Sequence, residues 1–313
     1  LNALSFSSQR SYLDNIVGRF YCYYPTDVFF SWGEDSSKKM QRKVIIKDNP
    51  AFKSILTTGC YMLDQYVLNQ YKDVEYIKDK FHSYGVKKTI LFLDTNHRLC
   101  TDWVGQTITT KKLEKLYIAI FTALIEHQEI GLIVKPKKSN FFNSLNITSI
   151  TEQALDTGRL HIVANPEGVK PSLYANISDV VLSIINHDIP ASLVECVLLK
   201  KPGILYNYGG LNSVEPELFS WAHNTVIFDT VVDVVSALKT FVLSQDSSLI
   251  GDWSSHILEF DPFLDFKAVN RIGFYLSLLL KYSHEELEKD IIIDIVNDEY
   301  SREFGKDKVA SIR

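Results

Sequence analysis

The chain has 313 residues, of which 46% are hydrophobic and 23% are charged, and its formal net charge is −5. This composition is typical of a globular protein with one large domain or two ordinary ones. The acidic balance excludes a global basic field, so we expect no nucleic-acid partner. No apolar run approaches the roughly 20 residues that cross a bilayer; the longest candidate, 272–280, is too short.

The four cysteines are scattered, with no CxxC pair and no spacing typical of a disulfide framework or a metal site. Each lies in or beside an apolar stretch, where a free thiol packs as a small hydrophobic group. We therefore expect a protein of a reducing compartment that holds no metal ion. These cysteines are Cys22, Cys60, Cys100 and Cys196.

The first 80 residues contain two strand-to-turn segments, at 27–35 and 54–60, separated by a basic stretch. Two strands do not make a domain, so we interpret this part as the end of another sheet. The chain also begins in mid-pattern, and we expect it to be part of a longer protein. A polar helix at 70–88 marks the boundary to the next domain.

From about residue 85 onward, short apolar strands alternate with helices and short connections. This alternation predicts an α/β fold with a doubly wound, mostly parallel, Rossmann-like sheet. Ligands of such sheets lie beyond the carboxyl ends of the strands, at the starts of helices. The predicted strands are 88–94, 131–136, 159–164, 179–185, 203–207 and 224–229, and the predicted helices are 113–127, 169–177, 190–199 and 231–243. An acidic amphipathic helix at 283–300 follows them.

The predicted helix that starts at Pro190 is the first candidate for a ligand site. The start of a helix carries free N–H groups and a partial positive charge, which favour a phosphate. Ala191 and Ser192 would be the phosphate donors, and Glu195, on the same face as Ser192, would bind two ribose hydroxyls. Glu195 can also be a capping-box or surface residue. Asp188 can either cap this helix or contact the ligand.

Two further strand ends carry polar side chains. Lys135 ends an apolar strand and can neutralise a diphosphate, or it can belong to a loop of ordinary surface lysines. Asn96 and Arg98 follow the strand 88–94, where they can contact phosphate or sugar or can form a simple polar turn. His187 is a weak candidate for a catalytic proton donor; a structural or exposed histidine is the alternative.

The glycine-rich phosphate loops and the hydrolase and protease motifs are absent. The sequence contains no GxGxxG after a strand, no GxxxxGK[ST], no GxSxG and no HExxH. The signatures of dinucleotide-dependent dehydrogenases, P-loop NTPases, α/β-hydrolases and zinc proteases are thus missing. The remaining α/β folds bind an anionic ligand without a glycine-rich loop.

Several segments in the same order resemble a known family. IVKPKK, then RLHIVANPEGVKPSLYANISDVVLS, then PASLVECVLLKKPGILY resemble the nucleotide-binding half of GT-B-fold glycosyltransferases. The bacterial surface-polysaccharide transferases are the most similar, in particular the capsule Kdo-transferase-like and CDP-glycerol glycerophosphotransferase-like groups. DPFLDFKAVNRIGFYL and DVFFSWGE followed by ILTTGCYMLD also resemble segments of these enzymes.

By this resemblance, Lys135 matches the basic residue of the family's K/R-P-H segment. Ser192 and Glu195 match its helix-start hydroxyl and its ribose-binding acid. The chain departs from the family where Lys137 replaces the histidine, where NHDIPAS replaces a D-Y-S-S turn, and where Phe266 replaces a glycine. These departures affect the choice of donor.

The resemblance implies three regions. Residues 1–84 would be the remnant of an N-terminal, Rossmann-like acceptor domain with a linker. Residues 85–282 would be the nucleotide-sugar-binding domain, and residues 283–313 a C-terminal amphipathic helix and tail that crosses back to the first domain. The catalytic base would belong to the first domain, so this chain would be a donor-binding portion.

The implied function is a metal-independent glycosyltransferase of capsule or other surface polysaccharide synthesis. It would move a sugar from a nucleotide-sugar donor to a polysaccharide or lipid-linked acceptor. We expect a cytoplasmic location, with peripheral association at the inner face of the plasma membrane as a further expectation. Two alternatives stay open, a sugar-nucleotide epimerase of the same architecture and a non-catalytic α/β binding module.

Overall fold

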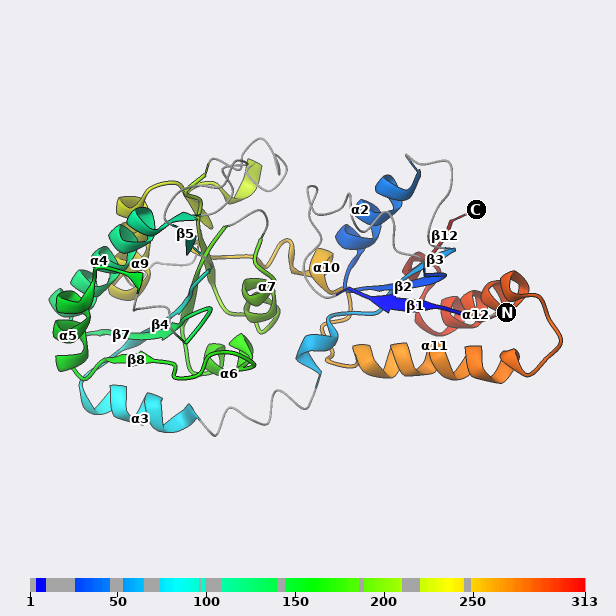
Figure 1. Ribbon diagram of the computed structural model, residues 1–313, viewed down its shortest axis with the longest axis horizontal. Coiled ribbons are helices and arrows are strands. Elements are labelled where there is room, and N and C mark those ends of the chain that lie inside the picture. The colour runs from blue at the N-terminus through cyan, green and yellow to red at the C-terminus, as the bar shows by residue number, and fades with distance from the viewer. Residues whose placement is uncertain are drawn as a thin grey trace. The chain divides into compact units, whose positions relative to one another are not determined.

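The computed structural model of the chain contains two compact units (Figure 1). Unit 1 comprises Leu1–Tyr66 and His256–Arg313, and unit 2 comprises Val67–Ser255. The structure describes residues 4–9, 26–45, 53–64, 74–95, 97–98, 108–139, 144–185, 189–209, 220–244 and 249–312; the side chains at 35, 39, 42–45, 97 and 98 are not among the described groups.

The sheet of unit 2 has six parallel strands in the order β11-β10-β9-β4-β7-β8. The chain therefore winds outward from β4 in one direction and then crosses to wind outward in the other. This order confirms the predicted doubly wound parallel sheet. The strands are β4 (Lys88–Leu93), β7 (Ile130–Lys135), β8 (Leu160–Ile162), β9 (Val180–Ile184), β10 (Gly203–Tyr206) and β11 (Ile227–Phe228).

Helices cover both faces of this sheet, and the four predicted helices of this region are present. The helix α5 and the short parallel pair β5 and β6 were not predicted. The elements are α3 (Glu75–Ser83), β5 (His97–Arg98), β6 (Ile108–Thr109), α4 (Thr110–Glu126), α5 (Thr148–Asp156), α6 (Pro171–Ala175), α7 (Ala191–Leu198) and α9 (Val231–Leu243).

The central strands are apolar along their whole length because both of their faces are covered. Ile90 and Phe92 of β4 belong to one core cluster with residues of α4 and α9. Residues on the other face of the sheet pack against α7. On β10, a Cβ added at Gly203 would lie 2.9 Å from the Val197 side chain of α7 and 3.1 Å from that of Leu193. Burial on both faces thus explains why the predicted strands had continuous hydrophobic runs.

Unit 1 combines both ends of the chain in one sheet, in the order β1-β2-β3-β12, in which β12 is antiparallel to β3. Tyr275 of α11 and Val296 of α12 pack with Val28 and Phe30 of β2. The elements are β1 (Phe6–Ser8), β2 (Val28–Ser31), α2 (Glu34–Ile45), β3 (Ser54–Thr57), η1 (Tyr61–Leu63), α10 (Ile257–Phe260), α11 (Ala268–Ser283), α12 (Lys289–Phe304), η5 (Lys306–Lys308) and β12 (Val309–Ser311).

The boundaries of the compact units, 66/67 and 255/256, differ from the expected 84/85 and 282/283. At the first boundary, α3 packs onto unit 2, since a Cβ on Gly131 of β7 would lie 2.7 Å from the Phe81 ring. At the second, α10 and α11 belong to unit 1. The helix expected over 283–300 is α12, which begins at Lys289.

The segment 261–276, part of the family resemblance, anchors unit 1 internally. Asp261 accepts a hydrogen bond from the Cys60 N–H (2.8 Å), and Asp64 accepts one from the Val269 N–H at the start of α11 (2.6 Å). Arg271 donates to the Thr58 carbonyl (3.1 Å) and pairs with Asp265. These contacts join the segment after β3 to the helix that returns from unit 2.

Substitution of Gly33 tests how closely α10 packs against the start of α2. A Cβ at Gly33 would lie 2.2 Å from the Glu259 carbonyl and 2.4 Å from that of Phe260, so Gly33→Ala forces backbone groups apart. We expect a loss of about 1–3 kcal/mol in the free energy of unfolding. Denaturant unfolding followed by the fluorescence of the neighbouring Trp32 measures it.

The matched control is Gly273→Ala, on an exposed position of α11 where the added Cβ meets nothing within 4 Å. Alanine there should stabilise the helix by about 0.5–1 kcal/mol. Equal unfolding midpoints for Gly33→Ala and the parent chain would contradict the close approach of α10 to Gly33.

Candidate functional site

The candidate site lies at the carboxyl edge of the sheet in unit 2. Asp94 follows β4, Lys135 ends β7, and α7 follows β9. Since β4 lies between β7 and β9, these three points are neighbours along the edge. The strand order reverses between β4 and β9, which is the topological switch point where doubly wound sheets bind ligands.

The start of α7 has backbone N–H groups without a described acceptor. Pro190 has extended backbone angles and precedes the helix, rather than forming its first residue as predicted. Its carbonyl accepts the N–H groups of Leu193 (2.8 Å) and Val194 (3.2 Å). Among the described residues, no side chain caps this end, and no acceptor contacts the N–H groups of Ala191 and Ser192.

Glu195 is buried on α7, with 4% of its surface exposed. Its Oε2 has no hydrogen-bond partner in the described part of the chain. Burial raises the pKa of this carboxyl to about 7, although the nearby ammonium groups of Lys170 and Lys135 act in the opposite direction. A surface glutamate or a capping box does not explain a carboxyl in this environment, because neither buries an unpaired oxygen.

Lys135 is half-buried, and its Nζ donates a hydrogen bond to the Pro166 carbonyl (3.1 Å) in the loop after β8. Burial lowers the pKa of Lys135, and so does the neighbouring Lys137, while Glu195 raises it. The structure therefore places the predicted lysine and the predicted acid in one electrostatic environment. Lys137 and Lys138 are exposed, as expected for solvated lysines.

The remaining predicted residues stay predictions. Asn96, His187 and Asp188 lie outside the described residues, and of Arg98 only the backbone, in β5, is described.

Three residues of this edge were missed from the sequence: Asp94, Lys170 and Ser172. Asp94 is partly exposed as a residue, but its Oδ2 is buried and has no hydrogen-bond partner in the described regions. Burial raises the pKa of Asp94 well above its usual range. Ser172, in the first turn of α6, is buried, and its Oγ likewise lacks a described partner. A polar residue directly after an apolar strand was the one available signal for Asp94.

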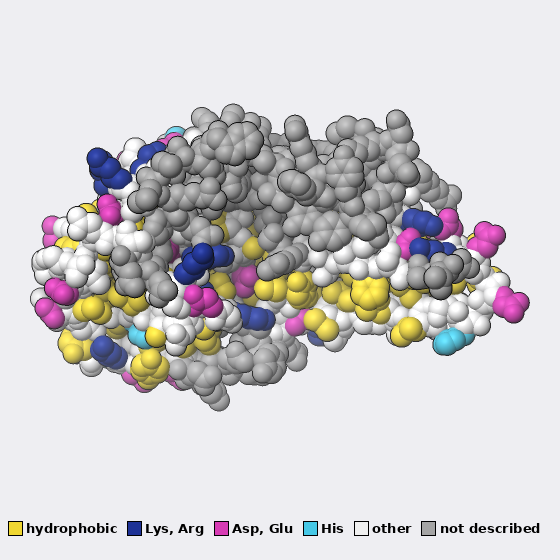
Figure 2. All heavy atoms as spheres, in the orientation of Figure 1, with side chains coloured by type: hydrophobic (Ala, Val, Ile, Leu, Met, Phe, Trp, Pro, Cys, Tyr) yellow, Lys and Arg dark blue, Asp and Glu magenta, His cyan; other side chains and the backbone are white. Residues whose placement is uncertain are grey.

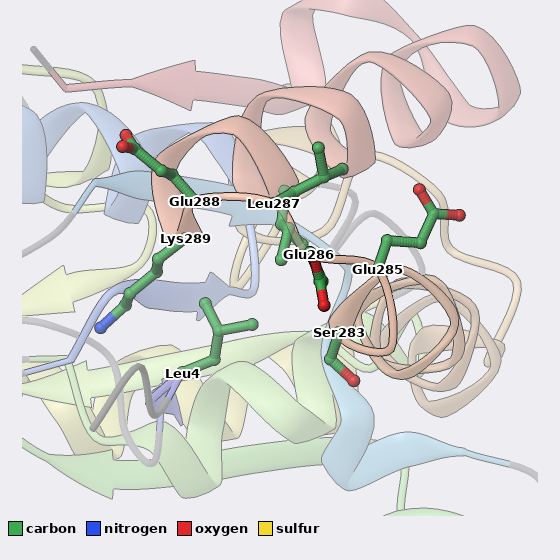
Figure 3. Close-up of a pocket in the computed structure, with 8 residues that line it drawn as sticks. Leu4, Ser283, Glu285, Glu286, Leu287, Glu288 and Lys289 are labelled. Atoms are coloured by element: carbon green, nitrogen blue, oxygen red, sulfur yellow. The ribbon is translucent and has the colours of Figure 1, made fainter.

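Other features of the described residues lie elsewhere. A pocket of about 380 Å³ in unit 1 is lined by Leu4, by residues of the turn between α11 and α12 such as Glu285 and Glu286, and by Lys289 at the start of α12 (Figure 3). It contains none of the predicted site residues. Within the described ranges, no three His, Cys, Asp or Glu side chains form a group suited to a metal ion.

The distribution of basic side chains bears on nucleic-acid binding, and the length and hydrophobicity of the helices bear on membrane crossing. On the face shown in Figure 2, the described Lys and Arg side chains stand apart from one another, among Asp and Glu side chains. Over its described residues this face thus shows no continuous basic stripe of the kind that binds nucleic acid. No helix in the described ranges is long and apolar enough to cross a membrane.

Comparison with known proteins shows the fold. No protein-family model matches this sequence, and no curated protein does. Among solved structures, the wall teichoic acid polymerase TagF matches with 14% identity and a TM-score of 0.51 over 94% of this chain and 68% of its own. A UDP-N-acetylglucosamine 2-epimerase matches with 17% identity and a TM-score of 0.51 over 84% of this chain and 60% of its own.

These two likenesses show that the chain has a GT-B-like, Rossmann-type fold, as the resemblance in the sequence implied. The chain spans about two thirds or less of the length of these enzymes.

The buried carboxyl of Glu195 should make stability depend on pH. Its pKa is about 7 in the folded chain and near the ordinary value of 4.5 when unfolded, so the folded state holds the extra proton between these values. Its contribution to stability is therefore complete below pH 4.5 and is lost as the pH rises through 7. Relative to the parent chain, Glu195→Gln should gain up to about 3 kcal/mol between pH 4.5 and pH 8.

Denaturant unfolding across this pH range measures the gain, and Glu152→Gln on the exposed surface of α5 is the matched control. A difference between Glu195→Gln and the parent chain that does not change with pH would show that the carboxyl is not buried.

Proposed function

We propose that this chain is the donor-binding portion of a glycosyltransferase that moves a sugar from a nucleotide-activated donor to a polysaccharide or lipid-linked glycan. The observation that carries the proposal is the buried carboxyl of Glu195, whose Oε2 has no partner among the described residues and whose pKa Lys135 influences, at the carboxyl edge of a doubly wound sheet. A hydroxyl pair on a ribose would supply the partners that this carboxyl lacks.

Each described residue has a chemical task in this proposal. The N–H groups of Ala191 and Ser192, at the positive end of α7, would hold a phosphate. Lys135 would neutralise further negative charge as the bond between sugar and phosphate breaks. No metal ion is needed for this stabilisation of the leaving group, and metal independence is part of the proposal. His187 stays a weak candidate for the proton donor.

The finer assignments are also proposals. The donor and acceptor would be like those of the Kdo-transferase-like or CDP-glycerol glycerophosphotransferase-like groups. The reaction would serve the synthesis of capsule or another surface polysaccharide. The protein would be cytoplasmic and would associate with the inner face of the membrane. The fold shared with a wall teichoic acid polymerase supports these assignments. The acceptor site and the catalytic base are assigned to sequence that these longer enzymes contain beyond the matched part.

A sugar-nucleotide epimerase is the second candidate. It is supported by the fold shared with a UDP-N-acetylglucosamine 2-epimerase and by the two buried carboxyls, Asp94 and Glu195, whose raised pKa values suit proton transfer. Incubation with a nucleotide sugar in D₂O separates the candidates. An epimerase would place deuterium on a sugar carbon or release free sugar and nucleotide, whereas a donor-binding portion alone would leave the nucleotide sugar unchanged.

Nucleotide binding tests the main proposal. A thermal-shift panel with CMP, CDP, UDP, GDP and inorganic pyrophosphate should show stabilisation by at least one nucleotide, of about 2.7 kcal/mol at 100 times its dissociation constant. Glu195→Gln should weaken nucleotide binding but leave pyrophosphate binding intact, because pyrophosphate has no ribose. Absence of any nucleotide effect on the parent chain would refute the donor site and favour a non-catalytic binding module.

Lys135 provides a second, independent test. Lys135→Met removes one charge-assisted contact, so it should weaken the binding of both nucleoside diphosphate and pyrophosphate by about 10- to 100-fold. The control is Lys138→Met, an exposed lysine of the same loop, which should bind as the parent chain does. Equal losses in the two variants would show that the loop acts only through its overall charge.

A further inference from the structure

Asp94 occupies an unexpected place for an acid. In the sheet, Leu93 pairs with Lys135 of β7 on one side and with Ser183 of β9 on the other. Asp94 therefore stands between Lys135 and the strand that leads to α7. A charged carboxylate beside a bound phosphate would repel it, but burial raises the pKa of Asp94 well above its usual range and so favours the neutral acid.

The contacts of Asp94 tie the end of β4 to the end of β7. Its backbone N–H donates to the Lys135 carbonyl (3.2 Å), which continues the ladder one step beyond the strands. Its Oδ1 accepts the Thr95 N–H (2.5 Å). The backbone N–H of Lys137 and the ammonium groups of Lys137 and Lys135 act on the same carboxyl and favour its charged form, against the larger effect of burial.

The connections continue into the next loop. Lys135 Nζ donates to the Pro166 carbonyl (3.1 Å), and the Ser139 N–H donates to the Glu167 carboxylate (2.7 Å). The loops that follow β4, β7 and β8 are thus joined into one hydrogen-bonded rim, in which Asp94 follows the strand that pairs with β9. The other rim contacts described above, from Lys135 to Pro166 and from Ser139 to Glu167, are made by the loop that begins at Lys135.

Among the described residues, Asp94 Oδ2 has no hydrogen-bond partner, so folding alone does not account for the carboxyl. A buried acceptor without a partner costs about 1–3 kcal/mol, and an apolar residue at this position would avoid that loss. The Oδ1 contacts need only an acceptor, which an amide also supplies. The arrangement therefore favours a role in placing Lys135 over a role in stabilising the sheet.

We propose that Asp94 is a positioning residue, which holds the loop after β7 so that Lys135 is directed toward the phosphate bound at the start of α7. This inference rests on the proposed nucleotide site. Asp94 does not itself touch the phosphate; it acts through Lys135.

A double-mutant cycle on the full chain tests this coupling. Dissociation constants for the best nucleoside diphosphate of the panel are measured by titration calorimetry for Asp94→Ala, Lys135→Met and the double variant. Asp94→Ala should weaken binding about tenfold, and the double variant should bind no more weakly than Lys135→Met alone, because the two residues act as one unit. Asp94→Asn keeps the acceptor at Oδ1 and should bind as the parent chain does.

Asp179→Ala is the matched control. Asp179 accepts the Thr89 N–H (2.7 Å), so it also anchors β4, but at the amino end of the strand, away from the site. Its loss should lower stability without changing nucleotide affinity. If Asp94→Ala does not fold, Asp94→Leu, which has the same branched shape and no acceptor, takes its place in the cycle.

The outcomes separate this inference from the proposed function. Binding by Asp94→Ala equal to that of the parent chain, fully additive losses in the double variant, or no rescue by Asp94→Asn would overturn the positioning role while the nucleotide site stands. Failure of the parent chain to bind any nucleotide would overturn the proposed function, and the positioning role with it.

Discussion

The reversal of strand order between β4 and β9 is the constraint on which the candidate site depends. The chain first winds outward through β7 and β8, then crosses β4 and winds outward through β9, β10 and β11. The connections after β4 and β9 consequently leave the sheet toward opposite faces. The carboxyl ends of these two strands are therefore not covered by one common loop. Lys135, Asp94 and the start of α7 are neighbours only because these strands are neighbours.

Several buried polar groups gather at this edge. Asp94 Oδ2, Ser172 Oγ and Glu195 Oε2 are buried and lack hydrogen-bond partners in the described part of the chain. All three follow carboxyl ends of parallel strands, whereas the interior of the sheet is apolar. Such local violations concentrate at functional sites, since a ligand supplies the missing partners. The buried polar groups without described partners and the reversal of strand order thus lie at the same edge.

The sequence was sufficient for the elements whose burial is local. Strands such as β4 and β9 are apolar on both faces, and their runs were recognisable without any tertiary information. The sequence was insufficient for α2, whose segment 34–45 is mostly polar with few apolar residues, and for β12, which pairs with β3 far away in the chain. Glu195 was predicted from its position after Ser192, but Lys170 and Asp94 were not, because their proximity to the site is set by strand order.

The division of the chain has a consequence for function. Both ends of the chain build unit 1, where β12 pairs with β3 and Arg271 joins α11 to the Thr58 carbonyl. All described residues of the candidate site, by contrast, lie within unit 2, which is continuous in sequence. The groups of the candidate site therefore depend on the packing of one uninterrupted stretch of chain, in which burial raises the pKa of Asp94 and Glu195 and lowers that of Lys135. A nucleotide bound at this edge should therefore stabilise unit 2, because all described residues of the candidate site belong to it.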